Sequence, residues 1–223
     1  MSLTTNLSSR PFLGLLAAWL LTISVIGYLS MHLGYTQLYA ENGLMENLQV
    51  IFLCLALPGF AHAALTTEHT DKTLPWFLAL LVFAFIFREL DIEKFNSPAW
   101  AAFLFAGDGR ALYLLPLLGM LLKLLFSARH FIQYASYYLD ARSITYLALA
   151  ALCYGVFSEL FDKKYVPIEH SDFWEESLEI AATMLLFAAS FRLLTFDLNQ
   201  IARQIAADQS SSVAADSSAE EST

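Results

Sequence analysis

The chain contains 223 residues, of which 57% are hydrophobic and only 15% are charged, and its mean hydropathy is +0.54. Soluble domains contain about 25% charged residues, so this composition excludes an ordinary water-soluble domain and predicts an integral membrane protein. The formal net charge of −9 argues against nucleic acid as a partner, because binding to phosphates requires clustered Lys and Arg side chains.

Apolar segments recur along the chain at lengths close to the roughly 20 residues that a helix needs to cross a bilayer. They predict an all-α, polytopic membrane protein, a bundle of about six transmembrane helices arranged as three hairpins. The first segment is too long for the apolar region of a signal peptide and lacks a clear cleavage site, so we expect an uncleaved helix. The predicted spans are Phe12–Leu33, Gly43–Leu65, Leu74–Ile92, Ala111–Ala128, Ile144–Phe161 and Phe173–Phe196.

A connecting segment before the fourth span is also expected to be structured. Ser97-Pro98 precedes a short apolar stretch and Gly107 follows it, and these residue types are typical of a helix start and a helix end. The stretch is too short to cross a bilayer, which favours an interfacial or re-entrant helix.

The distribution of Lys and Arg between the two sides of the predicted bundle predicts cytoplasmic N- and C-termini. The expected location is a bacterial inner (plasma) membrane. Residues 1–199 would form the six-helix transmembrane domain. Residues 200–223 are rich in Ser, Ala and acidic residues, and we expect them to form a disordered acidic cytoplasmic tail.

Acidic residues gather at the predicted outer ends of the spans, and several lie inside a span. A charge at membrane depth costs at least about 2.5–3.5 kcal/mol, so such residues usually face the bundle interior and pair with another group. In the sixth span, Asp172, Glu176, Glu179 and Thr183 share one helix face because they are spaced by three or four residues. Glu179 lies about two turns inside the span, too deep to serve as a helix cap.

Other spans add carboxylates to the same predicted layer. Each has a structural alternative, such as compensation of a helix dipole at Glu46 or an ion pair of Arg88 with Glu89 or Glu179. A carboxylate in a low-dielectric site can also act as a general acid or base. The candidate catalytic residues are Glu46, Glu89, Glu159, Glu176 and Glu179.

Three basic residues are candidates for substrate binding: Arg88, Arg110 and His170. Arg110 ends a Gly-Asp-Gly-Arg segment before the fourth span, which could hold an anion such as a lipid phosphate or form a plain turn. His170 is the histidine that falls in the acidic layer, as a loop residue or a proton-transfer group. Because oxygen ligands favour hard cations, Mg²⁺ or Ca²⁺ is a candidate cofactor.

Three hypotheses about function remain open at this stage. The first is an intramembrane enzyme that opens to the outer side and acts on a lipid or a lipid-linked substrate. The second is a small ion- or proton-coupled transporter, since intramembrane Glu residues can be proton or cation sites. The third is a non-catalytic membrane partner of an envelope protein complex, for which a deep residue such as Glu179 is not required.

Overall fold

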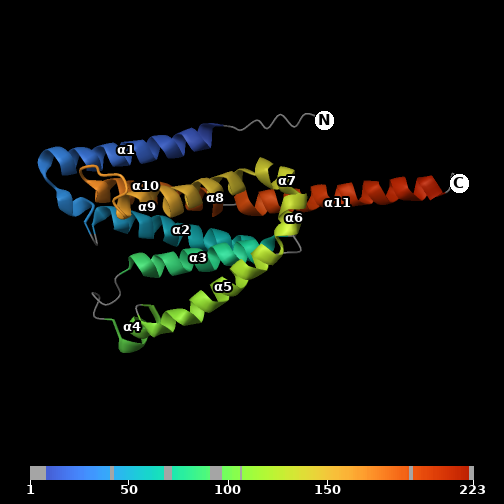
Figure 1. Ribbon diagram of the computed structural model, residues 1–223, viewed down its shortest axis with the longest axis horizontal. Helices are drawn as coiled ribbons and strands as arrows, with labels where there is room; N and C mark the ends of the chain where they lie inside the picture. Colours follow the sequence, from blue (N-terminus) through green and yellow to red (C-terminus); the bar gives the residue numbers. More distant parts are fainter. Residues whose placement is uncertain are drawn as a thin grey trace.

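The computed structural model describes residues 9–40, 43–67, 72–90, 97–105, 107–190 and 193–220. Within these ranges the regular secondary structure is entirely helical. The long helices lie side by side with their axes in a similar direction, and α11 extends beyond one end of the bundle (Figure 1). The first helices are α1 (Ser9–Leu33), η1 (Thr36–Leu38), α2 (Leu44–Thr66), α3 (Thr73–Glu89), α4 (Ala99–Phe105), η3 (Asp108–Arg110) and α5 (Ala111–Phe126). The later helices are α6 (Ala128–Gln133), α7 (Ala135–Asp140), α8 (Arg142–Leu152), η4 (Cys153–Ser158), α9 (Glu159–Asp162), α10 (Ser171–Ser190) and α11 (Leu193–Glu220).

The described helices agree with a membrane-embedded, all-α chain. By length and composition, four continuous helices could cross a membrane, and a fifth candidate is the bent pair of α10 and α11. The expectation of an all-helical polytopic protein is therefore confirmed, whereas the number six and the arrangement as three hairpins are not. The four continuous candidates are Phe12–Leu33, Leu44–Thr66, Asp108–Phe126 and Arg142–Asp162.

Two of the predicted spans differ from the structure. The third, expected to reach Ile92, corresponds to α3, which has 17 residues and ends at Glu89. The sixth, expected to continue to Phe196, is divided because α10 ends at Ser190 and α11 starts at Leu193, with the two axes bent by 55°.

Asp197 explains part of the position that α11 takes after this bend. Its Oδ2 accepts hydrogen bonds from the backbone N of Ser143 at 2.8 Å and from the Ser143 hydroxyl at 2.7 Å. The first amides of a helix lack partners within the helix, so this carboxylate caps the start of α8 from a distant part of the chain. Asp197 is only 7% exposed, which makes the cap part of the packed interior.

Residues assigned by sequence to a disordered tail continue α11 as a helix to Glu220. Leu194, Leu198, Ile201 and Ile205 are buried at steps of three and four residues, so one face of α11 packs on the bundle beyond position 200. The start of α1 lies at the same end of the bundle as α11 (Figure 1).

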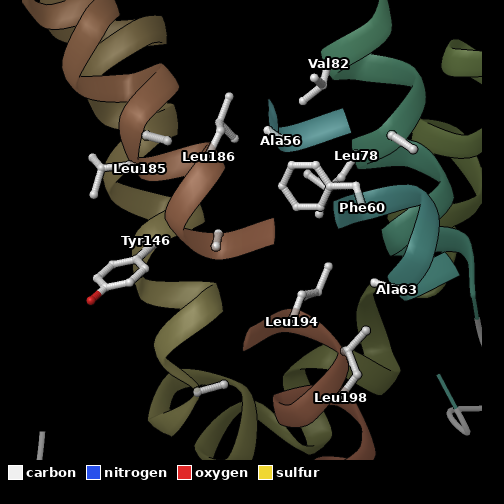
Figure 2. Close-up of a cluster of buried hydrophobic side chains, with 14 of the residues drawn as sticks. Ala56, Phe60, Ala63, Leu78, Val82, Tyr146, Leu185, Leu186, Leu194 and Leu198 are labelled. Atoms are coloured by element: carbon white, nitrogen blue, oxygen red, sulfur yellow. The ribbon is translucent and has the colours of Figure 1, made fainter. Parts of the chain in front are cut away.

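The main core lies among α2, α3, α8, α10 and the first half of α11. Phe60 of α2 is fully buried, and Figure 2 shows it in the cluster that contains Leu78 of α3 and Leu186 of α10. Beside this core, α2 and α10 approach closely at Gly59, where an added Cβ would lie 2.6 Å from Ser190 Oγ. Small residues at helix crossings allow this close packing in membrane proteins.

By contrast, α5 has no buried residue among those described, and its leucines are largely exposed. Exposed leucines along a whole helix are typical of a face that meets lipid rather than water. The apolar exterior and the apolar core together support the assignment to a membrane.

The span that contains α8 is interrupted by η4, a π-helix at Cys153–Ser158, before it continues as α9. A π-helix adds a residue to a turn, which shifts the side chains that follow around the helix axis. The buried face of α8 contains Tyr146 and Ala150 and would reach Phe157 in a regular α-helix. Phe157 is instead 45% exposed and Ser158 is buried.

Candidate functional site

Most of the acidic residues selected from the sequence lie at the end of the bundle opposite the projecting part of α11 (Figure 1). Helix α2 begins at this end and α3 finishes there, while α10 begins there and packs against α2. Glu46 and Glu176 therefore come from the parallel helices α2 and α10, and Glu89 comes from α3, which runs antiparallel to both. The three carboxylates lie in one layer because α2 and α10 begin at the end of the bundle where α3 finishes.

Arg88 connects two of these helices. Its Nε lies 3.3 Å from Glu89 Oε1 on α3, and its Nη2 lies 3.4 Å from Glu179 Oε1 on α10. The π-helix contributes two hydroxyl groups. Tyr154 donates to Glu89 Oε1 at 3.1 Å, and the Ser158 hydroxyl shares its proton between the backbone oxygen of Tyr154 at 2.9 Å and Glu179 Oε1 at 3.4 Å. We refer to Arg88, Glu89, Tyr154, Ser158 and Glu179 as the Arg88 network.

The members of the Arg88 network differ sharply in exposure. The side chains of Glu89 and Glu179 are 8% and 6% exposed, whereas that of Arg88 is 53% exposed. The two carboxylates thus face the interior, and the Arg88 side chain that pairs with them is partly exposed at the surface. A buried carboxylate is tolerated only with charge or hydrogen-bond compensation, which Arg88 and the two hydroxyl groups supply.

Tyr154 holds Arg88 from a second direction. The guanidinium carbon lies 5.0 Å from the centre of the Tyr154 ring, within the range of a cation–π interaction. The Tyr154 ring also stacks on the ring of Phe85, with the two ring centroids 4.8 Å apart and the ring planes at 16°. Arg88 is therefore oriented by two carboxylates and one aromatic ring, while about half of its side chain remains exposed.

A second polar pair lies between α2 and α10. Gln49 is fully buried, and its Nε2 donates to Glu176 Oε2 at 2.7 Å. Its Oε1 has no hydrogen-bond partner among the described residues. Glu46 lies close enough to interact electrostatically with both Glu176 and Glu89, which connects this pair to the Arg88 network.

Glu159 lies outside these contacts. It pairs with Lys163, and the two side chains are 46% and 54% exposed. The hydrogen bond to the Glu159 carboxylate raises the pKa of Lys163 above its ordinary value. The neighbouring Ser158 occupies the buried position that the sequence analysis gave to Glu159.

The other two basic candidates also lie apart from the Arg88 network. Arg110 Nε donates to the backbone oxygen of Phe105 at 2.8 Å and so binds the end of α4. His170 has a positive φ of 59°, and its Nδ1 is 3.0 Å from the hydroxyl of Tyr39. The first contact connects η3 to the end of α4, and the second connects the loop before α10 to Tyr39. Neither contact involves the carboxylates of the Arg88 network.

Sequence reasoning did not select Tyr154 or Ser158, which both belong to the site. They are four residues apart, and a polar pair at this spacing inside an apolar span is the signal that could have identified them. Three further acidic residues near the predicted outer ends of the spans, Glu41, Asp91 and Glu93, lie outside the described residues.

Among the described residues, no group of three or more His, Cys, Asp and Glu side chains is arranged to hold a metal ion. The expectation of Mg²⁺ or Ca²⁺ thus finds no preformed site in this part of the chain. The chain matches no protein-family model, no curated protein and no solved structure.

Proposed function

We propose that this integral membrane protein binds an amphiphilic substrate with an anionic group, a lipid or a lipid-linked molecule, at the Arg88 network and acts on it by acid–base chemistry. The observation that carries the proposal is the half-exposed side chain of Arg88, whose guanidinium group is held by the nearly buried carboxylates of Glu89 and Glu179. Binding and proton transfer would then take place on adjacent groups.

The exposed part of Arg88 is suited to the anionic group. A guanidinium group presents donors in a fixed plane and binds phosphate or carboxylate oxygens with two parallel hydrogen bonds. Because Glu89 and Tyr154 already orient it, little side-chain entropy is lost when an anion binds. The apolar exterior of the neighbouring helices would accommodate the acyl chains.

Glu179 is the group best placed to transfer a proton. The whole residue is only 4% exposed, and its carboxylate lies beside the guanidinium group of Arg88 and the hydroxyl group of Ser158. A carboxylate in a site that excludes water can be tuned to exchange protons near neutral pH, and positioned acid–base catalysis contributes about 10²–10⁴-fold to a rate. In this proposal Arg88 binds substrate and Glu179 is the acid or base.

Experiments on the reconstituted protein test separately whether Arg88 binds the substrate and whether Glu179 transfers a proton. Full-length protein in vesicles of phosphatidylethanolamine and phosphatidylglycerol is analysed by native mass spectrometry for retained lipid and by lipid mass spectrometry for new products. We expect Arg88→Gln to retain less phosphatidylglycerol, and Glu179→Gln to retain it while losing at least about 100-fold in product formation.

Glu159→Gln is the matched control, because it neutralises a carboxylate of the same layer that pairs with Lys163 at the surface. It should behave like the wild type in both measurements. Equal lipid retention by folded Arg88→Gln, or equal product formation by folded Glu179→Gln, would contradict the proposal.

Ion- or proton-coupled transport is the second candidate, and a different observation favours it. Carboxylates on α2, α3 and α10 interact electrostatically across the bundle, namely those of Glu46, Glu89 and Glu176. Intramembrane carboxylates of this kind can carry protons or cations. Proton or cation flux into liposomes that Glu89→Gln abolishes would support transport over catalysis.

A further inference from the structure

A buried amide oxygen without a partner lies at the packed boundary of α2 and α10. Gln49 is 0% exposed, its Nε2 is bonded to Glu176, and its Oε1 has no hydrogen-bond partner among the described residues. Buried side-chain acceptors are almost always satisfied, because leaving one unpaired costs about 1–3 kcal/mol. The amide therefore points to a bound group that offers positive charge or a donor.

A proton on Glu176 does not satisfy this amide. With Glu176 ionised, Nε2 donates to the carboxylate and Oε1 lacks a partner, as in the structure. If Glu176 were protonated and the amide turned over, the carboxyl group would donate to Oε1 and Nε2 would lack an acceptor. In both arrangements one polar atom of Gln49 is unsatisfied.

The charge around the amide favours a cation as the missing partner. Glu176 is bonded to the neutral Gln49 rather than to a basic side chain, and it interacts electrostatically with Glu46, Glu89 and Glu179. An ionised carboxylate in this position is stabilised at membrane depth by a nearby positive charge. A cation beside Oε1 would satisfy the amide and compensate Glu176 together.

We propose that a small monovalent cation, with sodium as the probe, binds between α2 and α10 with Gln49 Oε1 and the Glu176 carboxylate as ligands. Glu46 lies one turn before Gln49 on the same face of α2 and adds negative charge nearby. Amide and carboxylate oxygens are ligands of hard cations. Calcium takes six to eight oxygens, and the described residues contain no three-carboxylate group for it.

Thermal unfolding of the full-length protein in detergent tests this site. The wild type is measured at fixed pH and ionic strength while sodium chloride replaces choline chloride. A ligand that binds only the folded state raises Tm, and we expect a rise of about 4 °C when sodium reaches ten times its dissociation constant. Gln49→Met, which keeps the side-chain volume and removes the amide oxygen, should abolish this rise.

Glu159→Gln should keep the sodium-dependent rise, because Glu159 lies on the exposed side of α9. If Gln49→Met does not fold, sodium NMR line broadening by the wild type, reversed by lithium, replaces that comparison. A wild-type Tm that is the same in sodium, lithium, potassium and choline, with no line broadening, would overturn the proposal and leave water as the partner of Oε1. The proposal does not depend on the lipid substrate, since its measurements contain no substrate.

Discussion

Arg88 and Glu179 are 91 positions apart in the sequence, yet Arg88 Nη2 lies 3.4 Å from Glu179 Oε1. The contact joins the last turn of α3 to a point about two turns inside α10. Since Glu179 is nearly buried and Arg88 is half exposed, the pair leads from the bundle interior to its surface. Because of this difference in burial, we expect substitutions of Arg88 and Glu179 to reduce the stability of the protein by different amounts.

Arg88→Gln should destabilise the protein more than Glu179→Gln. Removing the guanidinium group leaves Glu89 and Glu179 buried without their cation, and we expect the free energy of unfolding to fall by about 2 kcal/mol, a value reduced for the exposure of Arg88. Glu179→Gln removes one of the two buried charges and keeps an oxygen for Ser158, so its loss should be smaller. Thermal or denaturant unfolding in detergent measures both changes.

The double variant separates the ion pair from general destabilisation. Residues in contact show non-additive changes, so Arg88→Gln with Glu179→Gln together should cost less than the sum of the single changes by at least about 0.5 kcal/mol. Strict additivity would mean that the two side chains do not interact in solution.

Helical spacing and depth pointed to residues that the structure brings together, and also to Glu159, which the structure places apart from them. Glu179 was selected because it lies too deep for a cap, and its link to Arg88 was one of the alternatives that the sequence left open. Glu159 was selected because it lies about one turn inside the outer end of the fifth span. The π-helix at Cys153–Ser158 turns Ser158 inward, and Glu159 pairs with Lys163 at the surface.

The helix boundaries show the same limit of local reasoning. The apolar run from Phe173 to Phe196 predicts one continuous helix, yet α10 ends at Ser190. Asp197 then caps α8 by binding Ser143, 54 positions earlier in the chain. Such a long-range contact leaves no periodic signal, so the hydropathy of the segment could not show where the helix would divide.

Tyr154→Phe should weaken the Arg88 network while keeping the ring in place. The change removes the hydroxyl group that donates to Glu89 Oε1 at 3.1 Å and retains the stacking on Phe85. A buried carboxylate that loses a donor costs about 1–2 kcal/mol, so Tm should fall by a few degrees. The matched control is Tyr113→Phe, whose ring contacts Phe83 at the other side of α3. Equal stability of both variants would show that the Tyr154 hydroxyl contributes nothing.

Gly59→Val should disrupt the packing of α2 on α10. A Cβ at this position would lie 2.6 Å from Ser190 Oγ, 2.8 Å from Ser190 Cβ and 3.0 Å from Ser190 C, so the backbones must separate. Overpacking of this kind costs about 1–3 kcal/mol, and we expect a lower yield of monodisperse protein and a lower Tm. Gly119→Val is the control, since no atom lies within 4 Å of its added Cβ. If the two variants behaved alike, the close crossing of α2 and α10 would be wrong.

Asp197→Ala should loosen the start of α8 before it affects the rest of the bundle. The variant removes the acceptor of the Ser143 amide and hydroxyl group, and loss of a helix cap costs about 1 kcal/mol. Asp197→Asn keeps one side-chain oxygen and should retain more of the cap. Hydrogen exchange of the first amides of α8 measures the effect. The control is Asp208→Ala, because Asp208 also lies on α11 and accepts a hydrogen bond from Tyr137 at an exposed position. The expected order of protection is wild type and Asp208→Ala first, then Asp197→Asn, then Asp197→Ala. Unchanged protection in Asp197→Ala would mean that α8 is capped by another group and that the position of α11 is not fixed by this contact.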